Sequence, residues 1–102
     1  PNFFGNNIVE GEIIFLKNDN FKNLDNKIIC IRSADPGYDF IFNHKISGLV
    51  TEYGGANSHM SIRCSELSIP AAIGIGEKNF SKINKAKIIR LDCKHEKLEL
   101  VK

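Results

Sequence analysis

The sequence predicts an α/β domain built from a mixed sheet with short helices. Strand-like segments rich in β-branched residues alternate with short segments of helical periodicity, and glycine, proline or polar residues separate them. The chain also ends in two strand-like segments joined by a short polar turn, which is typical of antiparallel pairing. With 102 residues, 42% of them hydrophobic, the chain is long enough to form one compact core.

The predicted strands are short and lie between turn residues. In chain order they span residues 10–16, 27–32, 47–52, 71–76, 86–92 and 97–101. The last two are predicted to form a hairpin, and a single turn of helix is predicted at 80–83. Residues 1–9 are interpreted as a lead-in or linker, and a polar loop with two apolar residues is predicted at 17–26.

The first predicted helix follows an Asp-Pro pair. Asp35 has the side chain of a helix N-cap, and Pro36 suits the first helical position because its missing N–H needs no partner there. One face of this helix, at spacings of three, four and seven residues, carries Tyr38, Ile41, Phe42 and Lys45. Packing against a core explains the aromatic residues of this segment better than contact with a substrate does.

A second helix is predicted near 58–68. Met60, Cys64 and Leu67 share one stripe of this helix, which predicts that all three are buried. Pro70 ends the helix, because proline has no N–H to continue the helical hydrogen bonds.

The composition excludes some classes of partner. Lys and Arg number 14 against 12 Asp and Glu, and the formal net charge of +2 is too small to indicate a nucleic-acid or membrane-surface protein. No apolar run approaches the roughly 18 to 20 residues that a membrane-spanning helix needs. The three cysteines, Cys30, Cys64 and Cys93, have no CxxC spacing. Cys30 and Cys64 lie within apolar patterns, which favours buried, reduced thiols in a cytoplasmic protein.

A glycine turn between the strand at 47–52 and the second helix has the composition of an anion site. The strand ends near Thr51, and Gly54 and Gly55 let the backbone approach a bound group closely. Ser58 and His59 then fall at the start of the helix, where free N–H groups and the helix dipole favour an anion. An imidazole placed there can act as a nucleophile toward a phosphoryl group, because the surrounding donors stabilise the product.

Other interpretations of these residues are open at this level. A single histidine after a glycine turn is more often structural than catalytic, Ser58 can be only an N-cap, and Thr51 can be a buried structural residue. A metal site is not expected, because His44 and His95 lie in other segments and no ligand spacing surrounds His59. Dinucleotide binding is only weakly indicated, because GxGxxG is absent.

Residues 48–76 resemble the phosphohistidine, or swivelling, domain of the phosphoenolpyruvate-utilising enzymes; their sequence is GLVTEYGGANSHMSIRCSELSIPAAIGIG. The signature of that family is G-G-x-x-S/T/C-H-x-A/S-I, followed by a hydrophobic-Pro-Ala motif and a glycine. The matching positions are Gly54, Gly55, Ser58, His59, Ser61, Ile62, Ile69, Pro70, Ala71 and Gly74. The resemblance continues on both sides and covers nearly the whole chain. Pyruvate phosphate dikinase and phosphoenolpyruvate synthase are members of this family.

The resemblance implies that residues 1–102 are a swivelling β/β/α domain of a larger multidomain kinase, in which His59 accepts a phosphoryl group on Nε2 and passes it on. The residues implied to bind or support the phosphate are Thr51, Gly54, Gly55 and Ser58. The domain is expected to hold no cofactor or metal itself. ATP and Mg²⁺ are expected in an ATP-grasp nucleotide-binding domain of the parent chain, and the acceptor in a further domain. The implied activity is that of an ATP-dependent phosphotransferase, with no turnover by this domain alone.

The resemblance leaves the final acceptor open. Pyruvate fits the dikinase branch, whereas the segment DPGYDFIFNHK is more similar to the glutamine kinase branch, whose acceptor is an amide. One alternative is the carrier domain of a phosphoenolpyruvate-protein phosphotransferase, which delivers to a histidine of another protein. A second is a non-catalytic module that retains the fold.

One part of the second helix departs from the family pattern. Many members have Ala-Arg five and six residues after the histidine, where this chain has Cys64 and Ser65. Arg63 lies about 200° around the helix from position 65 (two steps of about 100° each), so it is not expected to replace that arginine directly. Cys64 is interpreted as a small core residue.

Overall fold

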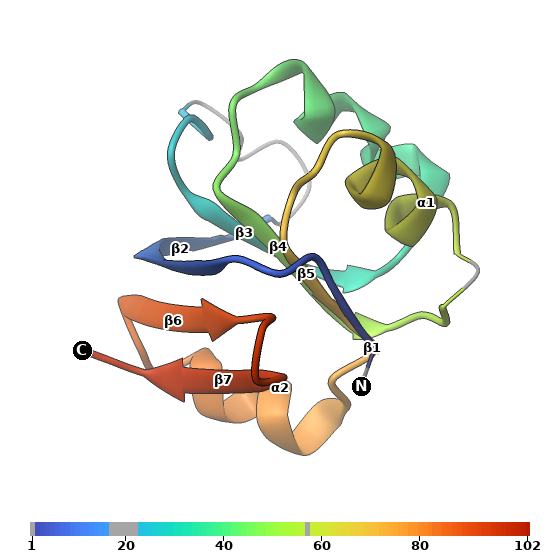
Figure 1. Cartoon of the computed structure of the whole chain (residues 1–102). Coiled ribbons are helices and arrows are strands. Elements are labelled where there is room, and N and C mark those ends of the chain that lie inside the picture. Colours follow the sequence, from blue (N-terminus) through green and yellow to red (C-terminus); the bar gives the residue numbers. More distant parts are fainter. Residues whose placement is uncertain (1, 17–22, 57) are drawn as a thin grey trace.

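A computed structural model describes residues 2–16, 23–56 and 58–102 of the protein. The strands are β1 (Asn2–Phe4), β2 (Ile8–Phe15), β3 (Ile28–Ser33), β4 (Gly48–Tyr53), β5 (Ala71–Ile73), β6 (Ile88–Asp92) and β7 (Lys97–Leu100). The helices are the 3-10 helix η1 (Pro36–Asn43) and the α-helices α1 (His59–Glu66) and α2 (Glu77–Ile83). Together they form the mixed α/β fold that the sequence predicts (Figure 1). No helix of the described part is long and apolar enough to cross a bilayer.

The strands form one seven-stranded sheet in the order β1-β5-β4-β3-β2-β6-β7. Its centre is parallel, because β2, β3, β4 and β5 pair with their neighbours in the same direction. Both edges are antiparallel, with β1 on β5 at one side and the β6–β7 hairpin on β2 at the other. The sheet is therefore mixed, and the carboxyl end of β4 leads directly along the chain to α1.

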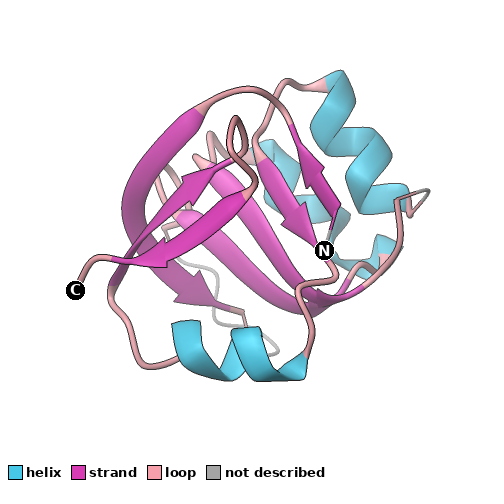
Figure 2. Cartoon of the chain, turned by 60° about the horizontal axis from the view of Figure 1, so that its bottom comes forward, coloured by secondary structure: helices cyan, strands magenta, loops and turns pink. Residues whose placement is uncertain are grey.

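Each face of the sheet carries its own core. Ile29 and Ile31 of β3 contribute to the core under η1 and α1, whereas Ile28 and Cys30 point to the opposite face. That second core lies between the sheet, α2 and the hairpin, and α2 lies on the far side from α1 (Figure 2). The alternation follows from the two-residue period of a strand, and the apolar residues 28–31 fit a central strand that is covered on both faces.

The structure corrects the interpretation of residues 1–9 as a lead-in. Asn2–Phe4 is strand β1, which pairs with β5, and β2 already begins at Ile8. Phe3 packs against one core and Phe4 against the other, so this strand is held by side chains on both faces. A three-residue strand followed by glycine and asparagines has too short a pattern to be recognised without its partner.

Several predicted boundaries also shift. The predicted strand at 71–76 contains only three strand residues, and the predicted turn of helix at 80–83 is the last part of α2. Helix α1 ends at Glu66, and Leu67, predicted to be buried, is 45% exposed because it lies beyond the last helical turn. The predicted loop at 17–26 lies mostly outside the described residues.

The three cysteines are buried and unbonded, as the apolar patterns around Cys30 and Cys64 predicted for those two. Burial raises the pKa of the Cys64 thiol to about 12 and also raises the pKa of the Cys30 and Cys93 thiols. Because the thiolate is the reactive form, we expect a disulfide reagent such as DTNB to modify none of them at pH 8 in the folded chain. All three should react after unfolding in guanidinium. Rapid modification of any cysteine before unfolding would contradict this burial.

Candidate functional site

Two glycines with positive φ shape the turn between β4 and α1, one within the turn and one in the neighbouring turn after β5. Gly54 has φ of 138°, and a Cβ atom on it would lie 2.6 Å from the Cβ of Ala34. Gly74, in the turn after β5, has φ of 72°, and a Cβ there would collide with the carbonyl oxygen of Gly54. Gly55 differs, because a Cβ atom on it would meet nothing within 4 Å. Gly54 is thus required by packing, whereas Gly55 faces open space.

Thr51 supports this turn from inside. Its side chain is fully buried, and its Oγ1 accepts a hydrogen bond of 2.9 Å from the backbone N–H of Gly74. Its carbonyl oxygen also accepts the N–H groups of Gly74 and Ile75. Thr51 therefore ties the end of β4 to the turn after β5, which is the structural role considered from the sequence.

Ser58 begins the helix. It is the N-cap of α1, and its Oγ accepts a hydrogen bond of 3.3 Å from the N–H of Ser61. The buried Ser61 hydroxyl lies 2.7 Å from the carbonyl oxygen of Ala56 and 2.8 Å from that of Ser58. These contacts confirm the N-cap role of Ser58 and fix the direction in which α1 leaves the glycine turn.

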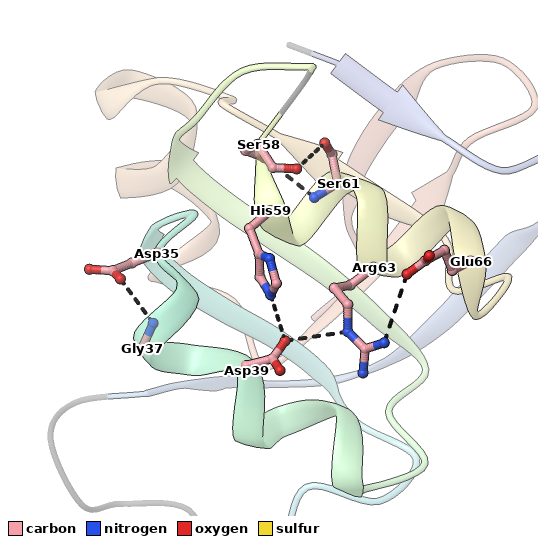
Figure 3. Close-up of polar contacts among 8 residues, drawn as sticks. All are labelled: Asp35, Gly37, Asp39, Ser58, His59, Ser61, Arg63 and Glu66. Carbon is pink, nitrogen blue, oxygen red and sulfur yellow. Dashed lines mark hydrogen bonds and ion pairs between the residues drawn. The ribbon is translucent and has the colours of Figure 1, made fainter.

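His59 is the first residue of α1, and its side chain is 42% exposed. Its Nε2 atom lies 2.9 Å from Oδ1 of Asp39, which belongs to η1 (Figure 3). An ionised carboxylate can only accept hydrogen bonds, so the short distance places a proton on Nε2 in this structure. The imidazole is therefore accessible, but the lone pair of Nε2 is not free.

Arg63 lies on the same side of α1, one turn after His59 (Figure 3). Its Nε is 3.4 Å from the same Asp39 oxygen, and its Nη1 is 3.8 Å from Glu66. The hydrogen bond from His59, together with the charge of Arg63, holds the pKa of Asp39 below its usual range, although partial burial opposes this shift. Asp39 is thus a carboxylate shared by two residues of α1.

The sequence of the chain matches a known family. Residues 23–96 match the family described as PEP-utilising enzyme, mobile domain. The chain belongs to this family. The mobile domain is also 36% identical over 69 residues to rifampicin phosphotransferase of Bacillus cereus. That similarity covers 67% of this chain and 8% of the relative, so the chain spans a small part of that protein.

The mobile domain brings all five predicted site residues to one end of the sheet. Thr51 is buried beneath the turn and Ser58 is half-buried, whereas Gly54, Gly55 and His59 are exposed. Within the described ranges, no group of three or more His, Cys, Asp or Glu side chains is arranged to hold a metal ion. The parts of the turn that can face an anion are backbone groups, the Ser58 hydroxyl and the imidazole.

Sequence reasoning missed Asp39 and underrated Arg63. The spacing of four residues between His59 and Arg63 was a usable signal, because side chains so spaced share a helix face. Asp39 lies 20 residues from His59, and no local pattern connects the two. The aromatic residues of η1 pack as predicted, since Tyr38, Phe40 and Phe42 contact the core beneath α1.

Proposed function

We propose that this chain is the phosphoryl-carrier domain of an ATP-dependent, dikinase-type phosphotransferase. In this proposal His59 accepts a phosphoryl group on Nε2 and passes it to a small-molecule acceptor bound elsewhere in the parent protein. The observation that carries the proposal is the position of His59, exposed at the first residue of α1 directly after the glycine turn. Membership of the mobile-domain family supports it.

The chemistry of imidazole suits a carrier. The Nε2 lone pair forms a bond to phosphorus while the bond from phosphorus to the leaving oxygen breaks, and the leaving group departs with that electron pair. Delivery reverses the arrangement: the acceptor attacks phosphorus, and the imidazole leaves with the electrons of the P–N bond. Imidazole leaves easily because it can be protonated near neutral pH.

The surrounding turn fits a negatively charged group. The first N–H groups of a helix have no partner within the helix, and the helix dipole favours an anion there. Gly55 leaves space for such a group next to His59, while Thr51 and Gly54 hold the turn in shape. Ser58 adds its hydroxyl at the same helix end.

The rest of the reaction belongs to other domains in this proposal. The nucleotide and Mg²⁺ would be held by an ATP-grasp domain, where positioning and charge neutralisation support in-line transfer. The acceptor would occupy a separate domain, reached as the carrier moves. The name of the relative, rifampicin phosphotransferase, supports a small-molecule acceptor as a class. Pyruvate and an amide such as glutamine are the candidates from the sequence.

The test uses the multidomain protein that contains this chain. It is incubated with ATP labelled at the β or at the γ phosphate, and separately with labelled phosphoenolpyruvate. Acid-labile, base-stable label on His59 from β-labelled ATP is the expected result. Label only from phosphoenolpyruvate would favour the phosphoenolpyruvate-protein phosphotransferase instead. The absence of label from every donor would indicate a module that has kept the fold without the chemistry.

A further inference from the structure

One carboxylate oxygen of η1 contacts two side chains of α1, those of His59 and Arg63. Oδ1 of Asp39 lies 2.9 Å from Nε2 of His59 and 3.4 Å from Nε of Arg63 (Figure 3). The N–H that donates to Oδ1 and a bond from Nε2 to phosphorus point in the same direction from the ring. Oδ1 therefore occupies space that a phosphoryl group on His59 would fill.

Arg63 is held beside this position by other contacts. Its guanidinium lies over the ring of Phe42, 5.2 Å from the ring centre, and Nη1 is 3.8 Å from Glu66. Its Nε atom is buried and has no hydrogen-bond partner among the described residues, since the contact with Asp39 lacks hydrogen-bond geometry. A buried donor without an acceptor is costly, so this Nε–H gains most from an oxygen placed slightly differently from Oδ1.

We propose that Asp39 occupies the phosphoryl site in the resting domain. Phosphorylation of His59 displaces the Asp39 carboxylate, and the Nε–H of Arg63 then donates a hydrogen bond to the phosphoryl group. The inference rests on the proposed function and adds two residues to its site. Before the step, Nε2 gives its proton to water while Nδ1 carries a proton, so the ring is a neutral imidazole with a free lone pair on Nε2. The Nε2 lone pair then bonds to phosphorus as the donor's leaving group departs with its electron pair.

Charge and accessibility favour this exchange. A phosphoryl group and the Asp39 carboxylate are both negative, so they repel each other at such a short distance. Asp39 can move aside because its side chain is 46% exposed and lies on the short helix η1. Arg63 remains in reach, and a hydrogen bond from arginine to phosphate is charge-assisted and stronger than its misaligned contact in the resting structure.

The experiment phosphorylates the 102-residue chain chemically with phosphoramidate, whose P–N bond breaks to release ammonia as the new P–N bond forms. NMR follows the Nε–H signal of Arg63, which should move downfield and become protected from exchange when His59 is phosphorylated. An unchanged Nε–H signal in fully phosphorylated protein would overturn the proposal. This measurement needs no variant and therefore does not depend on whether a substitution is tolerated.

Two variants test each half of the exchange. Arg63→Gln should shorten the lifetime of phosphorylated His59 about tenfold, because one charge-assisted hydrogen bond is lost. Asp39→Asn should speed phosphorylation of His59 several-fold, because the competing negative charge is gone. His95 is an internal control: it also pairs with an aspartate, Asp92, at 2.9 Å, and its phosphorylation kinetics should not change. Equal changes at both histidines, or no change at His59, would contradict the proposal.

Failure of this inference is distinguishable from failure of the proposed function. If the multidomain protein never labels His59 from ATP or phosphoenolpyruvate, the carrier function is wrong. Chemical phosphorylation still places a phosphoryl group on the ring, so the response of Arg63 is measured independently. If His59 is labelled enzymatically but Arg63 does not respond, only the exchange of Asp39 for the phosphoryl group is wrong.

Discussion

Replacement of His59 with alanine is expected to abolish phosphoryl labelling of this chain and the transferase activity of its parent, with the fold retained. The side chain is 42% exposed, and its polar contact among the described residues is to a partly exposed aspartate, so little packing is lost. We expect the melting temperature of the chain to stay within about 5 °C of the wild-type value. Acid-labile label is measured on the parent, and thermal unfolding on the 102-residue chain.

The matched control is His95→Ala, which removes an exposed histidine that also lies 2.9 Å from an aspartate. It should leave labelling and activity near wild-type levels. Activity that survived in His59→Ala would show that the phosphoryl group does not pass through this residue. A large drop in melting temperature in His59→Ala alone would instead indicate a structural histidine, the interpretation that the sequence left open.

Gly54→Ala is expected to be the most destabilising substitution in the glycine turn. The new Cβ would lie 2.6 Å from the Cβ of Ala34 and 3.1 Å from Cγ2 of Ile73, and the residue would retain a φ that side chains rarely adopt. Backbone strain and overpacking together should lower the free energy of unfolding by about 2–4 kcal/mol. Urea denaturation of the chain measures this change.

Gly55→Ala is the matched control for stability, since its Cβ would meet nothing within 4 Å. The free energy of unfolding should change by less than about 1 kcal/mol. If this space holds a phosphoryl group, the same variant should still slow labelling of His59 in the parent. If Gly54→Ala and Gly55→Ala lowered the free energy of unfolding equally, the inference that only Gly54 is required by packing would be wrong.

The sequence alone predicted the central strands and the position of the candidate site. β3 and β4 are central strands whose β-branched and apolar residues are local signals, so no knowledge of their partners is needed. The same is true of the turn from Gly54 to His59, because a strand end, two glycines, an N-cap and a helix follow one another along the chain. A site made from one continuous segment can be recognised from that segment.

Only the tertiary structure decided which residues surround Nε2 of His59 and which strand forms the edge of the sheet beside β5. β1 is a strand because β5 provides its hydrogen bonds, and its three residues carry no sufficient pattern of their own. Asp39 reaches His59 across 20 residues because η1 and α1 pack on the same face of the sheet. Such contacts depend on how helices are placed over a common core, and the local periodicity of a sequence contains no information about that placement.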